Sequence, residues 1–228
     1  MSKIKCIAFD LDDTLLDTSN LLIPIATEEA CAAMVKAGLR TTVRSCIEKR
    51  QEFLDRAIHE NIFREISSFY NPSDFETNAI AKAGEQAFYG RKIPDYLPIS
   101  SEAKGILENL KNKYTLFLVT SGELETQKAK VKAMQIEHFF SKIFYVHFRN
   151  ENKMTAFIKI LEITGCLPEQ LLSLGNRRSQ EVREAKQVGA KTCWLKTGEH
   201  KNEPPEIKED IPDFEISSLG EFIKTCQL

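Results

Sequence analysis

Two kinds of hydrophobic patterning alternate along most of the chain. Short apolar runs with β-branched and aromatic residues are typical of buried strands. The segments between several of these runs repeat apolar residues three or four positions apart, as amphipathic helices do. The predicted strands are residues 4–9, 114–120, 142–148, 171–175, 190–195 and 214–216, and the predicted helices between them are residues 100–113, 123–135, 153–165 and 179–189.

Strands that alternate with single helices predict a parallel sheet joined by right-handed crossovers. We therefore expect an α/β fold with a Rossmann-like doubly wound parallel sheet. Ligands of such sheets bind at the carboxyl ends of the strands, so functional side chains are expected there. The charged, proline-bearing segment 199–211 is predicted to be a solvated surface connection.

Residues 17–92 show no strand pattern. Helical periodicity runs through stretches at 21–38, 41–58 and 73–90, with breaks at Gly38, Asn71–Pro72 and Gly90. The predicted organisation is an α/β core from residues 1–16 and 93–228, interrupted by an all-helical domain from residues 17–92. Four phenylalanines are predicted to lie in the core of this helical domain: Phe53, Phe63, Phe69 and Phe75.

Composition narrows the class of protein. The 228 residues are 42% hydrophobic, with a net charge of -2 and a pI near 6.2. A nucleic-acid partner is disfavoured, because such proteins are usually basic. No apolar run is long enough for a membrane span and MSKIKC lacks a signal-like apolar block. We expect a cytoplasmic monomer or homodimer whose six cysteines are buried thiols without a CxxC pair.

Polar side chains gather at the ends of four predicted strands. They are Asp10, Asp12 and Thr14 after the first strand, Thr120, Ser121 and Gly122 after the second, Lys153 after the third, and Gly175, Asn176 and Glu181 after the fourth. The carboxyl ends of parallel strands lie at one edge of a sheet. These groups are therefore predicted to lie close together.

Such a set suits phosphoryl transfer to a carboxylate. One carboxylate attacks phosphorus as the nucleophile. A second carboxyl group protonates the leaving alkoxide and later activates water. Mg²⁺ prefers oxygen ligands and would offset the repulsion between carboxylate and phosphate. A lysine, a hydroxyl and backbone N–H groups at a glycine turn would hold the remaining phosphate oxygens.

The same residues carry a family resemblance. DLDDT at 10–14 resembles the first motif, DxDxT, of the haloacid dehalogenase-like (HAD) hydrolase superfamily. LFLVTSG at 116–122 resembles the second motif, Lys153 matches the third, and SLGNRRSQEVREAKQVGA at 173–190 resembles the fourth. The helical insert is similar to the C1-type cap of that superfamily, so the resemblance extends over nearly the whole chain.

The resemblance implies a role for each residue. Asp10 is the expected nucleophile and a Mg²⁺ ligand, and Asp12 the general acid and base, with its backbone carbonyl as a second ligand. Thr120 and Lys153 are the other expected catalytic residues, which bind the transferred phosphoryl group. The remaining expected residues are Thr14, Ser121 and Gly122 for the substrate, and Asn176 and Glu181 for the metal.

The fourth motif departs from the family pattern. Asn176 stands where the family has an aspartate, and Glu181 where it has a later aspartate. Fewer ligand charges predict weaker Mg²⁺ binding. We predict a Mg²⁺-dependent phosphatase that hydrolyses a small phosphorylated metabolite through an aspartyl-phosphate. The alternative is a catalytically impaired HAD-like protein that binds a phosphorylated ligand. Other HAD chemistries, including dehalogenation, stay open, although Asp12 favours a phosphatase.

Overall fold

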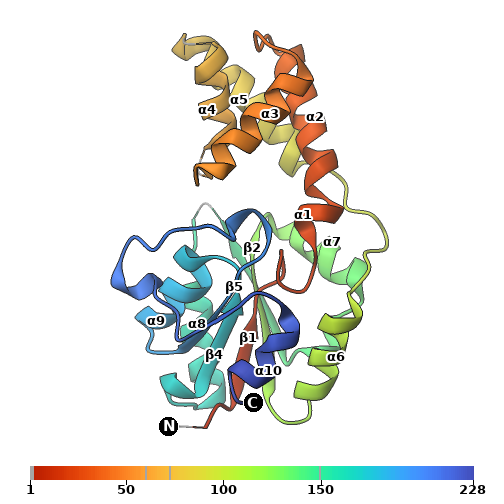
Figure 1. The fold of residues 1–228 in the computed structure, drawn as a ribbon. Helices are drawn as coiled ribbons and strands as arrows, with labels where there is room; N and C mark the ends of the chain where they lie inside the picture. Colours follow the sequence, from red (N-terminus) through yellow and green to blue (C-terminus); the bar gives the residue numbers. More distant parts are fainter. Residues whose placement is uncertain (1–2, 60, 72, 149) are drawn as a thin grey trace. The chain divides into compact units, whose positions relative to one another are not determined.

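The computed structural model describes residues 3–59, 61–71, 73–148 and 150–228, without the side chains of 74 and 75. The chain divides into two compact units. The first comprises Met1–Asp17 and Ile93–Leu228, and the second comprises Thr18–Lys92 (Figure 1). Each unit has its own hydrophobic core.

A six-stranded sheet forms the centre of the first unit. Its strands are β1 (Cys6–Phe9), β2 (Thr115–Gly122), β3 (Lys142–His147), β4 (Leu171–Gly175), β5 (Lys191–Leu195) and β6 (Phe214–Ile216). Every neighbouring pair is parallel, in the order β3-β2-β1-β4-β5-β6. This is the strand order of a doubly wound sheet, so the predicted fold class is confirmed.

Helices cover both faces of the sheet, as Figure 1 shows for α8 and α9 on one side and α6 and α7 on the other. Their bounds are α6 (Ser101–Leu110), α7 (Leu124–Met134), α8 (Lys153–Thr164), α9 (Arg183–Gln187) and α10 (Phe222–Thr225). Ala8 of β1 packs with Phe157 of α8, whereas its neighbour Phe9 meets Phe222 of α10, with ring centroids 5.8 Å apart. Burial on both faces explains why the strands have continuous apolar runs.

The strand order determines which loops meet. β1 lies between β2 and β4, with Phe9 level with Leu118 on one side and Leu174 on the other. The carboxyl ends of these three strands therefore form one edge around the point where the chain direction across the sheet reverses. Crevices at such switch points are the usual binding sites of open parallel sheets.

The second unit is helical. Its helices are α1 (Thr18–Leu21), α2 (Ile23–Lys36), α3 (Val43–Asp55), α4 (Ile62–Tyr70) and α5 (Asp74–Tyr89). α4 lies between the three stretches named from the sequence, within the region that was predicted to be all-helical. Phe53 and Phe63 are buried in the core as predicted, but Phe69 is 57% exposed and lies beneath the Lys49 ammonium group. The side chain of Phe75 and residue Pro72 lie outside the described residues.

Most residues of 199–211 are exposed, as predicted for a solvated surface connection, but two of its carboxylates bind other parts of the first unit. The Glu203 carboxylate accepts hydrogen bonds from the backbone N–H groups of Arg178 and Ser179. These residues begin a π-helical turn, Arg178–Val182, so the predicted helix 179–189 is α-helical only over Arg183–Gln187. Asp210 is fully buried and binds Arg183 through both carboxylate oxygens, at 2.6 and 2.9 Å. The charges of this segment therefore act as helix caps and ion-pair partners, which composition alone does not reveal.

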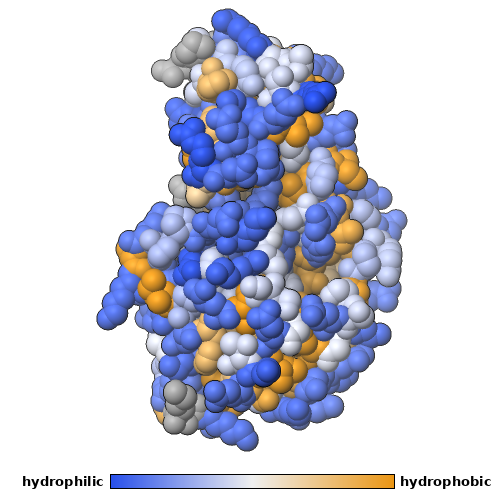
Figure 2. Space-filling model, viewed as in Figure 1, coloured by the Kyte–Doolittle hydropathy of each residue, from blue (hydrophilic) through white to orange (hydrophobic). Residues whose placement is uncertain are grey.

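Hydrophilic residues predominate on the face of the molecule in Figure 2, with apolar residues in small scattered groups. Among the described residues, no helix combines the length and the apolar character needed to cross a bilayer. The six cysteines are free thiols, all buried except Cys166, which is half-buried.

Asp210→Asn is expected to lower the free energy of unfolding near neutral pH by about 2 to 4 kcal/mol, because it leaves Arg183 without its buried anionic partner. Urea denaturation measures this difference. Glu206→Gln is the matched control, since Glu206 pairs with the same arginine but its side chain is 71% exposed. The control should change the stability by less than about 1 kcal/mol.

The pH dependence of this effect follows from the pKa of Asp210. Burial raises that pKa, but Arg183 and the N–H groups of Ile207 and Glu206 outweigh burial and hold it below its ordinary value. Such a carboxyl contributes stability above its unfolded pKa of about 3.9, and loses it as the pH falls through the folded pKa. The difference between wild type and Asp210→Asn should therefore shrink below about pH 4. A difference as large at about pH 3 as at neutrality would contradict this account.

Candidate functional site

A tight turn follows β1 and directs the first carboxylates. Asp10 continues the strand pairing by donating its N–H to the Leu174 carbonyl, at 2.9 Å. The Leu11 carbonyl then accepts from the N–H groups of the residues three to five positions later. Asp13 takes a left-handed backbone conformation, with φ of 55°, which aspartate tolerates better than most residues. The Thr14 hydroxyl donates back to Asp10 Oδ2 at 3.1 Å.

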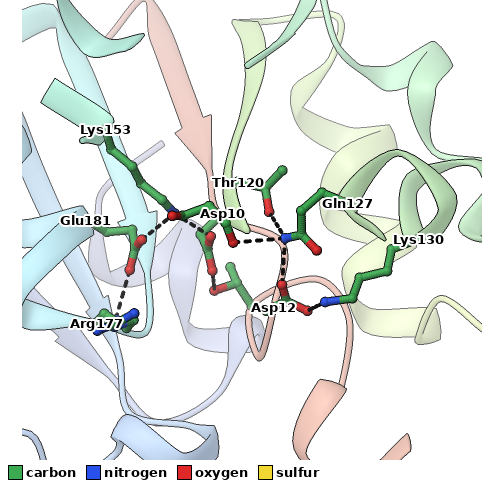
Figure 3. Close-up of polar contacts among 10 residues, drawn as sticks. Asp10, Asp12, Thr120, Gln127, Lys130, Lys153, Arg177 and Glu181 are labelled. Atoms are coloured by element: carbon green, nitrogen blue, oxygen red, sulfur yellow. Dashed lines mark hydrogen bonds and ion pairs between the residues drawn. The ribbon is translucent and has the colours of Figure 1, made fainter. Parts of the chain in front are cut away.

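Lys153 lies between two carboxylates (Figure 3). Its Nζ is 2.5 Å from Asp10 Oδ1 and also contacts Glu181 Oε1. All three residues are buried, with Lys153 and Glu181 each 2% exposed and Asp10 6%. Lys153 is the first residue of α8, which Asn152 caps through its side chain. The helix start thus delivers an ammonium group to the carboxyl ends of β1 and β4.

Burial and mutual attraction set the charge states of this cluster. Burial raises the pKa of Asp10 to about 7, although the neighbouring ammonium group of Lys153 opposes the shift. Burial alone would lower the pKa of Lys153, but Asp10 and Glu181 overcome it and raise that pKa to about 12. Lys153 is therefore a fixed cation. Asp10 is a carboxylate that depends on a cationic environment to stay ionised.

Gly175 makes room for Glu181. A Cβ atom at Gly175 would come within 2.1 Å of Glu181 Cγ, so any other residue would displace the glutamate. Glu181 Oε2 accepts a hydrogen bond from the backbone N–H of Arg177, at 2.9 Å. The π-helical turn after β4, together with Gly175 at the end of β4, holds the Glu181 carboxylate in place. Turns of this kind are frequent at functional sites.

The second carboxylate, Asp12, faces a different partner set. Its Oδ2 accepts from the side-chain amide of Gln127 at 2.8 Å, and its Oδ1 pairs with Lys130 Nζ at 2.7 Å. The same Gln127 nitrogen lies 2.5 Å from the hydroxyl oxygen of Thr120 and 3.1 Å from the Ser121 carbonyl (Figure 3). Thr120 is fully buried. Asp10 and Asp12 therefore belong to two separate polar networks that meet at the end of β1.

Asn176 follows β4 and is 4% exposed. Its side-chain N–H donates to the Thr197 carbonyl at 3.3 Å, and its own carbonyl accepts from the Trp194 indole at 2.9 Å. These bonds orient the residue so that the amide oxygen Oδ1 is the atom left to act as a ligand. In the described part of the chain, no group of three or more His, Cys, Asp or Glu residues is arranged to hold a metal ion.

The donor set nevertheless suits Mg²⁺. This cation is usually bound through one or two carboxylates, with waters and substrate phosphate in the remaining positions. Asp10 and Glu181 supply two buried carboxylates that share one ammonium group, and Asn176 adds a neutral oxygen. The cluster of Asp10, Glu181 and Lys153 carries a formal charge of −1, so a cation has a net negative site to enter.

Most of the predicted site residues are linked by direct contacts. Asp10, Thr14, Lys153 and Glu181 form one connected network, and Asp12, Thr120 and Ser121 meet through Gln127. Asn176 belongs to a third set of bonds, after β4. Gly122 ends β2 beside them. The roles of these residues remain predictions from the resemblance.

Two residues at this site were missed from the sequence. Gln127 and Lys130 look like ordinary members of a solvated helix face, yet they are 2% and 8% exposed. They share the buried face of α7 with Val131 and Met134, at the spacing of a helix stripe. Polar side chains within an apolar stripe are the signal that could have indicated them.

Comparison with known proteins shows what the chain as a whole is similar to. The family model described as haloacid dehalogenase-like hydrolase matches residues 7–195. A glyceraldehyde 3-phosphate phosphatase of Pyrococcus furiosus is 28% identical over 100% of this chain and 95% of its own length. The human N-acylneuraminate-9-phosphatase is 21% identical over 97% and 93%. A HAD-hydrolase of Bacillus subtilis, solved with magnesium bound, has a TM-score of 0.67 at 19% identity and covers 98% of both chains.

Lys153→Met is expected to lower the free energy of unfolding by about 3 to 5 kcal/mol, because it leaves two buried carboxylates without their shared cation. Thermal or urea unfolding in a metal-free buffer measures the change. Lys159→Met is the matched control on the same helix, since Lys159 is exposed. Equal stability of both variants would contradict the idea that the buried ammonium group holds the carboxylates together.

Proposed function

From the premise that this chain belongs to the haloacid dehalogenase-like hydrolase family, we propose that it is a Mg²⁺-dependent phosphatase acting through an aspartyl-phosphate at Asp10. Membership makes the protein a hydrolase, and the relatives described above are phosphatases of small phosphorylated compounds. The observation that best supports a phosphatase is the second carboxylate, Asp12. Asp12 lies two positions after Asp10 and contacts Lys130 and Gln127, whereas Asp10 contacts Lys153. Two carboxylates in different environments suit two different roles.

The proposed reaction has two steps. Asp10 attacks phosphorus and forms an aspartyl-phosphate, while the bond to the leaving oxygen breaks and Asp12 gives that oxygen a proton. Asp12, now a carboxylate, then takes a proton from water as the water oxygen attacks phosphorus and frees Asp10. Lys153 and the Thr120 hydroxyl bind the phosphoryl oxygens during both steps. Removal of a halide needs no protonation of an alkoxide, so Asp12 favours the phosphatase over a dehalogenase.

Mg²⁺ would be held by Asp10, the backbone carbonyl of Asp12, Asn176 and Glu181. When bound, it would neutralise the repulsion between the Asp10 carboxylate and the incoming phosphate. Asp10 in particular gains from a nearby cation, since burial disfavours its ionised form. Lys153 supplies part of that positive charge from the chain itself.

We further propose that the substrate is a small phosphorylated metabolite and that the helical unit, Thr18–Lys92, acts as a C1-type cap. This unit is inserted between β1 and α6, directly after the segment that carries Asp10 and Asp12. Lids of this kind exclude water during chemistry. The relatives named for glyceraldehyde 3-phosphate and for N-acylneuraminate 9-phosphate support a phosphorylated sugar, from a triose phosphate upward, as the substrate class.

Phosphate release from p-nitrophenyl phosphate and a panel of sugar and triose phosphates, across a Mg²⁺ titration, tests the proposal. Asp10→Asn should lower kcat by at least about a thousandfold, because an amide is not a nucleophile towards phosphorus. The variant keeps the size of the side chain, and circular dichroism checks that it folds. Turnover that survives in Asp10→Asn would overturn the aspartyl-phosphate route.

Asn176 decides between the phosphatase and a protein that only binds a phosphorylated ligand. Asn176→Asp adds one ligand charge and should lower the Mg²⁺ concentration for half-maximal activity by about tenfold. Asn109→Asp, on the exposed face of α6, adds the same charge elsewhere and should leave that concentration unchanged. An Asn176→Asp variant with unaltered Mg²⁺ dependence would show that Asn176 is not a ligand. Folded wild type and Asn176→Asp without turnover at any Mg²⁺ level would favour the binding protein.

A further inference from the structure

Helix α7 buries two polar side chains that have no evident place in a hydrophobic stripe. Gln127 and Lys130 are 2% and 8% exposed, beside Val131 and Met134. Burying an ammonium group is costly unless a partner of opposite charge and further hydrogen bonds compensate it. Lys130 finds its partner in Asp12, at 2.7 Å and far away in the sequence. Two buried positions of α7 are therefore occupied by side chains that bind this one carboxylate.

The orientation of the Gln127 amide is determined by its surroundings. Its side-chain nitrogen lies 2.8 Å from Asp12 Oδ2 and 3.1 Å from the Ser121 carbonyl oxygen. Both atoms accept hydrogen bonds, so the NH₂ group and not the amide oxygen must face them. Rotating the amide by half a turn would place oxygen against two oxygens. Gln127 is therefore a donor to the carboxylate.

The same nitrogen determines what the Thr120 hydroxyl can do. Thr120 Oγ1 is 2.5 Å from Gln127 Nε2, and because an amide NH₂ group only donates, the hydroxyl oxygen is the acceptor of this contact. The NH₂ group has two hydrogens for three acceptors, so one of its hydrogens is shared between two of them. The hydrogen of the hydroxyl is then available for another acceptor. A phosphoryl oxygen is an acceptor without hydrogens, so the hydroxyl is prepared to donate to it. One glutamine thus acts on both the predicted acid and base and the predicted phosphate-binding hydroxyl.

The missing side chain of Gly122 leaves the space that the Gln127 side chain occupies. A Cβ atom at Gly122 would lie 2.8 Å from Gln127 Cγ and 2.9 Å from Cδ. Contacts that short would force the glutamine away from Asp12. The backbone of Gly122 is not left-handed, so space and not conformation accounts for the glycine. The glycine of the second motif thus admits the glutamine side chain.

We infer that Gln127 and Lys130 are positioning residues for the reaction. Lys130 and Gln127 each hold one oxygen of the Asp12 carboxylate, and Gln127 also orients the Thr120 hydroxyl as a donor. The inference rests on the proposed function, in which Asp12 passes a proton to the leaving oxygen as the P–O bond breaks. A carboxyl group that rotates freely would less often be oriented towards that oxygen, so proton transfer to it would be slower.

The leaving group separates positioning of Asp12 from general damage. The p-nitrophenolate ion leaves readily without a proton, whereas the alkoxide of glyceraldehyde 3-phosphate requires one. The ratio kcat/KM reports the steps up to phosphorylation of Asp10, in which Asp12 acts as the acid. Lys130→Met should therefore lower kcat/KM for glyceraldehyde 3-phosphate by about 10- to 100-fold and for p-nitrophenyl phosphate by less than about threefold.

Two further variants sharpen the test. Lys130→Arg keeps the charge and should recover most of the loss for glyceraldehyde 3-phosphate. Lys128→Met removes a lysine from the same helix and is the matched control, because Lys128 is exposed and pairs with Glu125 on the surface. It should keep both kcat/KM values at the wild-type level. Gln127→Met removes the donor to Asp12 and to Thr120, so it should lower kcat/KM for both substrates.

Each outcome has one meaning. A larger loss for glyceraldehyde 3-phosphate than for p-nitrophenyl phosphate in Lys130→Met, with recovery in Lys130→Arg, supports the inference. An equal loss for both substrates, or no loss, overturns the inference alone, since the wild type is then an active phosphatase. If the folded wild type releases phosphate from p-nitrophenyl phosphate but from no sugar or triose phosphate, the inference is overturned, because no leaving alkoxide then needs the proton of Asp12. If the folded wild type releases no phosphate in an Asp10-dependent manner, the proposed function fails and the inference fails with it.

Discussion

The buried ion pair between Lys153 and the two carboxylates of Asp10 and Glu181 is the interaction on which the site depends. Without the ammonium group, two buried anions would face one another at the end of β1 and β4. Burial already shifts Asp10 towards its neutral form. The lysine offsets that cost in part and leaves a net charge of −1, which attracts a divalent cation. With the cation bound, the site would be positive and could accept a phosphate. Stability and proposed chemistry therefore draw on the same three side chains.

The parallel sheet makes this meeting possible. Asp10, Lys153 and Glu181 come from segments that are more than a hundred residues apart at the extremes, yet they follow β1, β3 and β4 of one parallel sheet, whose carboxyl ends lie at the same edge. A strand that ends at this edge of the sheet brings the polar residue that follows it to the site. Gly175 and the π-helical turn then adjust the Glu181 carboxylate locally. The long-range placement is a property of the strand order, and the short-range placement is a property of single turns.

The site contains two networks with different characters. The Asp10 network is buried and tightly paired through Lys153. The Asp12 network passes through Gln127 to the Thr120 hydroxyl and is anchored by Lys130 on α7. A nucleophile and a proton carrier have different requirements: the nucleophile must stay ionised, and the carrier must stay in one orientation while its proton comes and goes. In the proposed reaction, the separation of the two networks would meet both requirements within three residues of chain.

The sequence by itself determined the strands, the helices after them, the doubly wound fold and the residues DLDDT, Thr120, Lys153 and Asn176 as candidates. These follow from local periodicity and from polar residues at strand ends, and both are visible within a few positions. Only the tertiary structure decided that Gln127 and Lys130 hold Asp12 and that Phe69 is exposed. It also decided that Glu203 accepts from the Arg178 N–H group and that Asp210 pairs with Arg183. The physical reason is that a charge or an amide has the same local pattern whether it faces water or a partner. Its role is set by the partner, which the fold brings from a distant part of the chain.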